Sequence, residues 1–149
     1  MRIEEEIQQL KFRNEFHKLA VNIIFTHGWL MKKQAELFSR HNITGNQFNI
    51  LRILRGQYPN PASVNLLKER MLDKMSDVSR LVERLRIKGL VKREFSKGDR
   101  RRVDVSITDK GMKLLDEMDK LNQVYDSFLE NLNEKEAAKL SSLLDKLRG

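Results

Sequence analysis

Cysteine is absent from this sequence of 149 residues, and its absence excludes disulfides, thiolate zinc sites and cysteine redox switches. Proline (two) and glycine (seven) are scarce while 40% of the residues are hydrophobic, which is typical of a folded, mainly helical protein. No run approaches the roughly 18 apolar residues that a membrane span requires. The N-terminus, residues 1–6, carries three glutamates where a signal or transit peptide needs basic residues. We therefore expect a cytoplasmic domain without a membrane partner.

Patterns typical of enzymes are also missing. The sequence contains no Gly-rich phosphate loop, and no histidine lies near a plausible nucleophile. The three histidines, His17, His27 and His41, are not three or four residues apart, the spacing that lets one helix chelate a metal. We therefore expect no enzymatic activity, no metal and no cofactor.

Positive charge is concentrated in one segment. The chain carries 29 Lys/Arg and 21 Asp/Glu, a net charge of +8. Residues 68–102 hold 13 of the basic and six of the acidic side chains, whereas the other 114 residues hold 16 and 15. Composition alone fits either a solvated basic face or a polyanion site. The position of the charges has to decide between them.

Apolar residues recur at helical spacing over most of the chain. We expect one long helix over residues 3–41, with Ile3, Ile7 and Leu10 on its stripe, and a second helix opened by the capping box Thr44–Gln47. Residues 56–61 contain both prolines and predict a loop. Further helices are predicted over residues 63–71, 75–88 and 109–131, and after the capping residue Asn133.

The period changes to two after Gly89, a residue typical of helix C-termini. Alternation predicts strands over 91–95 and 103–107, joined by the charged tip 96–102. Two short helices joined by a three-residue turn, 72–74, and followed by a hairpin form a winged helix-turn-helix. The predicted fold class is therefore α+β, mainly α, with a long N-terminal helix and two C-terminal helices for dimerisation.

The second short helix has the properties of a recognition helix. A helix fits the major groove of B-DNA, where its N-terminal turns come closest to the base edges. Arg80 can fork onto a guanine, while Ser76 and Ser79 can bond a base or a phosphate. Arg84, one turn later, would meet a phosphate or an internal acid. A surface helix with ordinary salt bridges is the alternative interpretation.

The hairpin tip places three arginines in a row, which would repel one another without a polyanion nearby. An arginine on a slender hairpin suits the narrow minor groove. We expect Asp99 to hold one arginine in position through a salt bridge, although a solvated turn of mixed charge is the alternative. The predicted DNA-binding residues are Ser63, Lys74, Ser76, Asp77, Ser79, Arg80, Arg84, Lys97, Asp99, Arg100, Arg101 and Arg102.

One ordered series of motifs resembles the MarR family of transcriptional regulators. The resemblance rests on Ser79–Leu85, Gly89–Arg93, Ser96, Asp99–Arg101 and Val105–Gly111, and extends more loosely over the whole chain. Family membership implies a winged-helix dimer whose first and last two helices intertwine.

The resemblance also assigns roles to particular residues. It implies that Asp99 and Arg101 form the Asp-x-Arg pair of the wing, with Arg101 in the minor groove. The recognition helix would be 75–88. We expect a single winged-helix domain over 1–149, with a DNA-binding lobe at about 44–108 and dimerisation helices at about 1–41 and 109–149. The apolar stripes of the terminal helices also favour a homodimer, although such stripes can pack within a monomer.

Many MarR relatives bind small aromatic or phenolic anions between the dimer helices and the DNA-binding lobe. In this chain Phe25, His27, Trp29 and Phe48 could line such an effector pocket. The same residue types also form ordinary cores.

Taken together, the sequence predicts a homodimer that binds double-stranded DNA at a pseudo-palindromic operator and represses transcription, with relief by a small-molecule effector. Two alternatives fit the basic lobe. One is a DNA-architectural protein without sequence specificity, and the other is a helical adaptor that docks an acidic protein.

Overall fold

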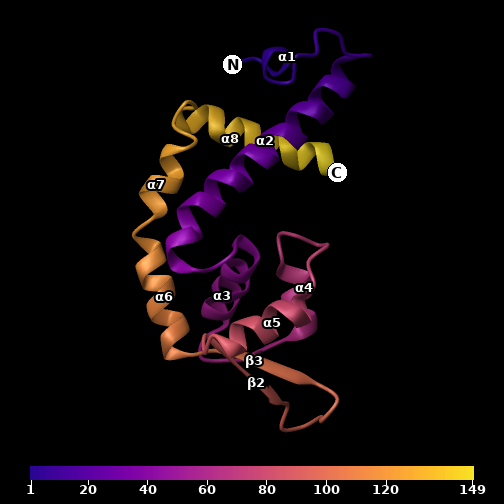
Figure 1. Ribbon diagram of the computed structural model, residues 1–149. Helices are drawn as coiled ribbons and strands as arrows, with labels where there is room; N and C mark the ends of the chain where they lie inside the picture. The colour runs from indigo at the N-terminus through magenta and orange to yellow at the C-terminus, as the bar shows by residue number, and fades with distance from the viewer.

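Side-chain caps begin the principal helices of the computed structural model, which describes residues 1–149 (Figure 1). Asn14, Thr44, Ser63, Thr108 and Asn133 each accept a hydrogen bond from a backbone N–H in the first helical turn. The elements are α1 (Ile3–Glu6), α2 (Glu15–Phe38), a 3-10 turn (Ser39–His41), α3 (Gly45–Gln57), β1 (Ala62–Ser63), α4 (Val64–Arg70), α5 (Val78–Ile87), β2 (Val91–Phe95), β3 (Val103–Ile107), α6 (Asp109–Asp119), α7 (Asn122–Ser127) and α8 (Glu134–Arg148).

The predicted fold class, mainly helical α+β with a winged helix-turn-helix, is confirmed. Helices α3, α4 and α5 surround a small sheet at one end of the molecule, and α1, α7 and α8 lie towards the other end (Figure 1). The sheet is antiparallel with the order β1-β3-β2. Strand β1 was not predicted; it pairs Ala62 with Val105 and Ser63 with Asp104, whereas the sequence pattern placed residue 63 at the start of a helix. No helix combines the length and the apolar character that crossing a bilayer demands.

A single hydrophobic core joins α3, α5 and the sheet. Ile50, Leu51 and Leu54 of α3 are fully buried against Val82 and Leu85 of α5 and against the sheet. The same core includes Phe38 at the end of α2 and, on α6, Leu115 and Met118. The end of α2 and the whole of α6 are therefore packed directly on the lobe.

The predicted single N-terminal helix is wrong. Helix α1 ends at Glu6, and α2 begins only at Glu15. Gln8 adopts a positive φ of 53°, which a continuing helix does not allow. Asn14 then caps α2, since its side chain accepts from the His17 N–H at 2.9 Å, and a good cap starts a new helix.

The predicted start of the recognition helix at residue 75 is also wrong, because α5 begins at Val78. Two aspartates explain the shift. Asp73 accepts hydrogen bonds from the Met75 N–H and the Ser76 hydroxyl, which hold residues 73–76 in a turn, and Asp77 caps the helix by accepting from the Arg80 N–H. Met75, predicted on the buried stripe, is consequently 93% exposed.

The helix predicted over 109–131 is divided. Helix α6 ends at Asp119, and α7 runs from Asn122 to Ser127. At the break the Leu121 N–H donates to the Met118 carbonyl at 2.9 Å, a tighter turn than an α-helix makes. Met118 is the last residue of α6 in the core.

An ion pair joins the lobe to α6. Two guanidinium nitrogens of Arg55 donate to the carboxylate of Asp119 at 2.8 and 3.1 Å, which holds the pKa of Asp119 below its ordinary value of 3.8. A carboxyl with a lower pKa in the folded chain stabilises the fold above its unfolded pKa and loses that contribution as the pH falls through the folded pKa.

Replacing Asp119 by Asn should therefore lower the free energy of unfolding at pH 7 by about 1 kcal/mol, a small value because the pair is partly exposed. The deficit should shrink as the pH falls below about 4. Urea unfolding of both proteins at pH 7 and pH 3.5 measures it, with Asp116→Asn as control because Asp116 lies 4.0 Å from Arg55 and is largely exposed. An equal deficit at both pH values would show that the ionised pair is not its cause.

Gly111 marks the closest approach of α6 to the lobe. A Cβ atom there would lie 2.4 Å from the Leu90 carbonyl oxygen, so Gly111→Ala should cost about 1–3 kcal/mol of stability as the backbones separate. The control is Gly56→Ala in α3, where nothing lies within 4 Å of the added Cβ and stability should hold or rise. Thermal unfolding compares the two. Similar midpoints for both variants would contradict the close packing.

Candidate nucleic-acid interface

Helix α5 buries one side and exposes the other. Val78, Val82 and Leu85 point into the core. Arg80 and Arg84 are exposed one turn apart, and neither takes part in a side-chain hydrogen bond or salt bridge within the chain. The helix therefore presents two unpaired guanidinium groups along one exposed stripe.

Several of the predicted binding residues have a structural role in this region. Ser63 caps α4, and its hydroxyl accepts from the Leu66 N–H at 3.1 Å. The Ser76 hydroxyl donates to the Asp73 carbonyl at 2.7 Å, and Lys74 Nζ donates to the Glu69 carbonyl. Asp77 lies before the helix as its cap. Ser79 and Arg80 are the predicted residues of the first turn whose side chains remain free.

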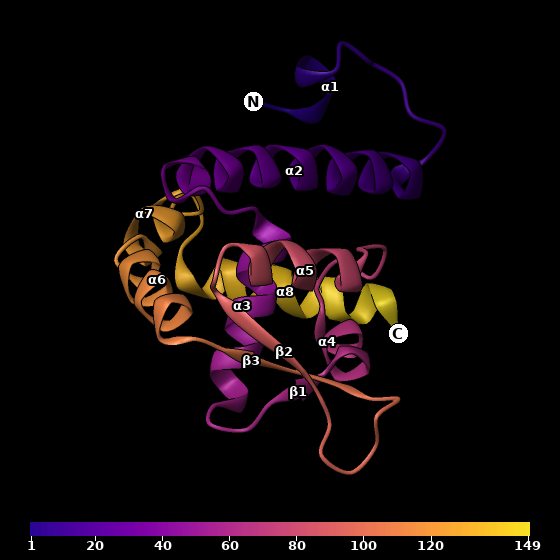
Figure 2. The ribbon, with the colours of Figure 1, turned by 60° about the horizontal axis from the view of Figure 1, so that its bottom comes forward.

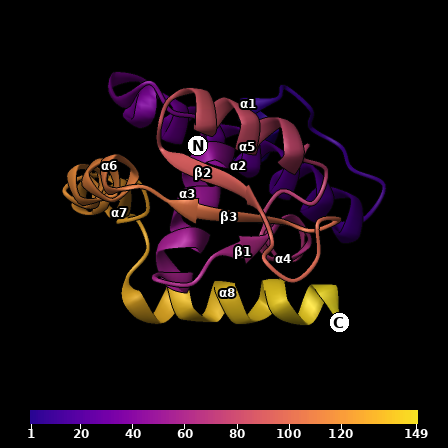
Figure 3. The same cartoon turned by 90° about the horizontal axis from the view of Figure 1, so that it is seen from below.

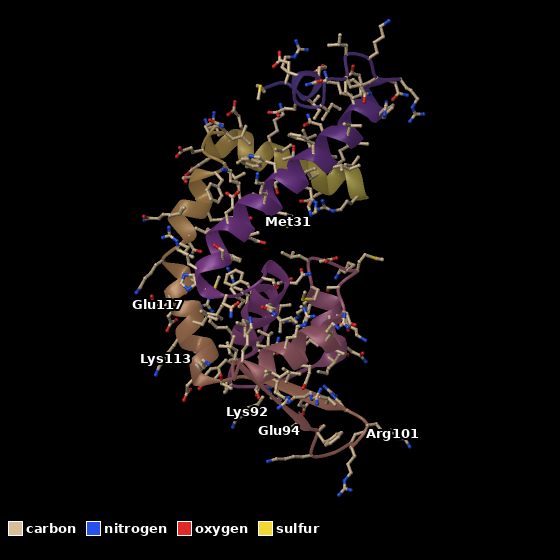
Figure 4. The ribbon with its side chains drawn as sticks, viewed as in Figure 1. Met31, Lys92, Glu94, Arg101, Lys113 and Glu117 are labelled. Atoms are coloured by element: carbon tan, nitrogen blue, oxygen red, sulfur yellow. The ribbon has the colours of Figure 1, made fainter.

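The wing is the β2–β3 hairpin, and its tip is fixed by the backbone. Ser96 N–H donates to the Arg102 carbonyl at 2.8 Å, and Arg102 N–H donates to the Asp99 carbonyl at 3.0 Å. Lys97, Arg100 and Arg101 are exposed, and Figure 4 shows Arg101 at the outer end of the hairpin, far from the helices at the opposite end. The tip therefore extends cationic side chains beyond the body of the protein.

The expected salt bridge from Asp99 to an arginine is not formed. Asp99 Oδ1 instead accepts the backbone N–H of Arg101 at 2.9 Å, the bond by which aspartate stabilises its own turn. The acid that pairs with an arginine is Asp104, whose Oδ1 lies 3.7 Å from Arg102 Nε. Asp99 thus orders the backbone of Arg101 and leaves its guanidinium group free.

Glu83 connects α5 to the wing, a role that the sequence did not reveal. Its carboxylate accepts from Arg86 Nε and Nη2 at 2.9 and 2.7 Å, and it lies 3.2 Å from Arg93 Nη1 on β2. The hydrogen bonds from Arg86, assisted by the charges of both arginines, lower the pKa of Glu83. Of these contacts, only the Glu83–Arg86 pair could have been predicted from the sequence, because residues three apart on a helix are neighbours.

The four predicted effector-binding residues do not form one pocket in this chain. Phe25 and Trp29 line a shallow hollow on α2 together with Ile24, Gly28 and Lys32. His27 is exposed and, two residues from Phe25 on a helix, points away from that hollow. Phe48 packs on Phe38 with ring centroids 4.8 Å apart. Phe25 and Trp29, four residues apart on α2, thus share one face, whereas His27 and Phe48 lie elsewhere in the single chain, and an effector role for the four residues stays a prediction.

Large apolar side chains are exposed on the terminal helices. Phe16 and Ile24 of α2 are 82% and 72% exposed, and Leu140, Leu143 and Leu147 of α8 are about half exposed. Helix α8 lies apart from α2 when the molecule is viewed from below (Figure 3), and it has no buried residue. Of the predicted N-terminal stripe, Ile3 is buried whereas Leu10 is exposed. Apolar faces of this kind are typical of interaction surfaces.

Comparison with known proteins agrees with this geometry. Residues 41–102 match the model of the MarR family. The transcriptional regulator PecS from Dickeya dadantii is 25% identical over 99% of this chain and 93% of its own. A mutant of MarR from E. coli, solved with operator DNA, is 26% identical with a TM-score of 0.79, covering 93% of this chain and 99% of its own. The BpsR protein of Bordetella bronchiseptica, whose DNA binding is regulated by 6-hydroxynicotinic acid, shares the fold with 24% identity, a TM-score of 0.76, and coverage of 85% and 89%.

Proposed function

We propose that this chain, which is similar to the MarR family over residues 41–102, is a DNA-binding transcription regulator that acts as a homodimeric repressor on a pseudo-palindromic operator. The proposal rests on one observation: Arg80 and Arg84 of α5 and the arginines of the wing are exposed, and the two of α5 have no partner within the chain. Helix α5 can enter a major groove with these side chains towards the DNA. The E. coli MarR mutant bound to operator DNA supports this use of the fold.

In this proposal, one end of the molecule binds DNA and the other end forms the dimer. Residues 44–108 bind DNA, and residues 1–41 and 109–149 dimerise. The apolar faces of α2 and α8 become buried between the subunits, which places the two α5 helices on one face of the duplex, with half-sites about 10 bp apart.

Selection of bound fragments from genomic DNA, followed by footprinting of the enriched fragments, tests the proposal. We expect one protected site with two related half-sites beside a promoter. Continuous protection without a boundary would instead support an architectural protein. Absence of any duplex affinity at low salt would favour the adaptor that docks an acidic protein.

Arg80 should carry part of the base recognition. If its guanidinium group forks onto guanine, Arg80→Ala should cost about 1–3 kcal/mol of operator affinity and relax preference at one symmetric pair of positions. Competition binding against operators changed one base pair at a time measures this, with Arg86→Ala as control because Arg86 is occupied by Glu83. Uniform weakening on every sequence would make Arg80 a phosphate contact.

We also propose that a small aromatic or phenolic anion relieves repression by binding at the hollow on α2. The aromatic rings of Phe25 and Trp29 and the ammonium group of Lys32 suit such a ligand. Regulation of BpsR by 6-hydroxynicotinic acid supports the ligand class. Because Trp29 is the single tryptophan, its fluorescence during titration with 6-hydroxynicotinic acid or salicylate reports binding. A fluorescence change that stays linear in ligand concentration up to the millimolar range, without saturation, would show that the hollow does not bind these anions.

A further inference from the structure

Phe95, the last residue of β2, is an exposed aromatic residue beside the cationic tip of the wing. Its side chain is 71% exposed, whereas the rest of the inward face of the hairpin is buried or half-buried apart from Arg93. A phenyl ring in water beside arginines contributes nothing to the folded core, and the dimerisation helices lie at the opposite end of the molecule (Figure 1). The ring is therefore free to contact a ligand that the neighbouring arginines attract.

The direction of the ring follows from the register of the strand. Side chains two residues apart on a strand share a face, so Phe95 lies on the same face as Val91, which is buried, and Arg93, which contacts Glu83 of α5. Its partner across the hairpin, Val103, packs against the core. Phe95 therefore faces the side of the sheet covered by α5 and not the outer face, where Lys92 and Glu94 extend (Figure 4).

Phe95 also lies at the open end of the angle between α5 and the wing. Strand β2 runs back along α5 from the helix C-terminus and diverges from it towards the tip (Figures 2 and 3). Two residues beyond Arg93, about 7 Å along the strand, the ring lies past the Glu83 contact, towards the end of α5 that carries Arg80. It is thus placed between the helix that enters the major groove and the tip that enters the minor groove.

We propose that Phe95 packs on the deoxyribose rings of the DNA strand that separates these two grooves. This inference rests on the proposed DNA-binding mode. The sugar is the apolar part of the nucleic-acid backbone, and the neighbouring arginines bind the phosphates on either side of it. The contact removes apolar surface from water and releases no counterion, so it adds affinity that does not depend on salt.

Phe95→Ser tests this through the salt dependence of binding. We expect operator affinity to fall by about fivefold to tenfold at every salt concentration, with the slope of log K against log salt unchanged. Phe95→Leu is the matched control, since it keeps an apolar side chain and should stay within about twofold of the wild type. Circular dichroism should show no change of fold or thermal midpoint.

Three results would overturn the proposal: unchanged affinity of Phe95→Ser, an equal loss in Phe95→Leu, or a shallower salt slope, which would mean that the ring only positions the arginines. If Phe95→Ser folds poorly, Phe95→Trp replaces it, and operator DNA should then change its fluorescence beyond the signal of wild-type Trp29. No additional change would equally overturn the contact. Failure of the wild type itself to bind duplex DNA would instead reject the proposed function.

Discussion

Removing residues 134–149 should convert the protein to monomer or aggregate. Operator affinity should fall by about hundredfold or more, because a monomer contacts only one half-site at a time. The truncation deletes α8, whose leucines at 140, 143 and 147 are about half exposed in the single chain. In the proposed homodimer, this apolar surface would be buried against the second subunit. Sedimentation velocity and fluorescence anisotropy on the same samples measure both effects.

A milder variant separates dimerisation from folding. Leu143→Glu leaves the helix intact because glutamate is a good helix former, but it places a charge on the expected interface. Lys139→Glu also adds negative charge to an exposed part of α8 without removing apolar surface, and it should remain dimeric. A truncated chain that sediments as a folded monomer and still binds tightly would show that α8 has no part in assembly.

If the wing binds DNA with little reading of sequence, as proposed, loss of Arg101 should weaken specific and nonspecific complexes together. If each subunit loses one phosphate-region contact, the slope of log K against log salt should become shallower by about 0.9 per subunit. The loss should be larger where an A·T-rich site narrows the minor groove. Titrations at four salt concentrations with Arg101→Ala and wild type measure it.

Asp99 provides the sharper comparison. Simple electrostatics predicts that Asp99→Ala binds more tightly, since an acid near phosphate repels it. The hydrogen bond from the Arg101 N–H to Asp99 Oδ1 predicts the opposite, because a disordered tip loses more conformational entropy on docking. Asp99→Asn is the control: it keeps the acceptor and removes the charge, so it should bind at least as well as the wild type. If Asp99→Ala keeps its fold and binds the operator more tightly than the wild type, Asp99 does not help the wing to bind DNA.

Much of the fold could be predicted because local patterns and tertiary packing agree. The capping boxes at Thr44 and Asn133, the C-terminal glycine at 89 and the strand pair β2 and β3 all appear in the structure as expected. Where two local signals compete, the prediction failed. The apolar Met75 fits the helical stripe, but the turn that Asp73 forms and the cap at Asp77 are stronger.

The arrangement of the wing could be predicted only in part, because its contacts join distant segments. Arg93 lies ten residues after Glu83, and their meeting depends on how β2 folds back along α5. The exposure of Phe95 likewise follows from where the hairpin leaves the core. An apolar residue in an alternating strand predicts burial, and only the packed structure shows that α5 no longer covers it.

The most direct test of the account is the ratio of affinities for the selected operator and for an unrelated duplex of equal length, measured by fluorescence anisotropy at one physiological salt concentration. Sequence-specific binding by a dimer predicts a ratio of about a thousand or more. A ratio near one, with both affinities falling steeply as salt rises, would contradict it and make the lobe a general electrostatic contact.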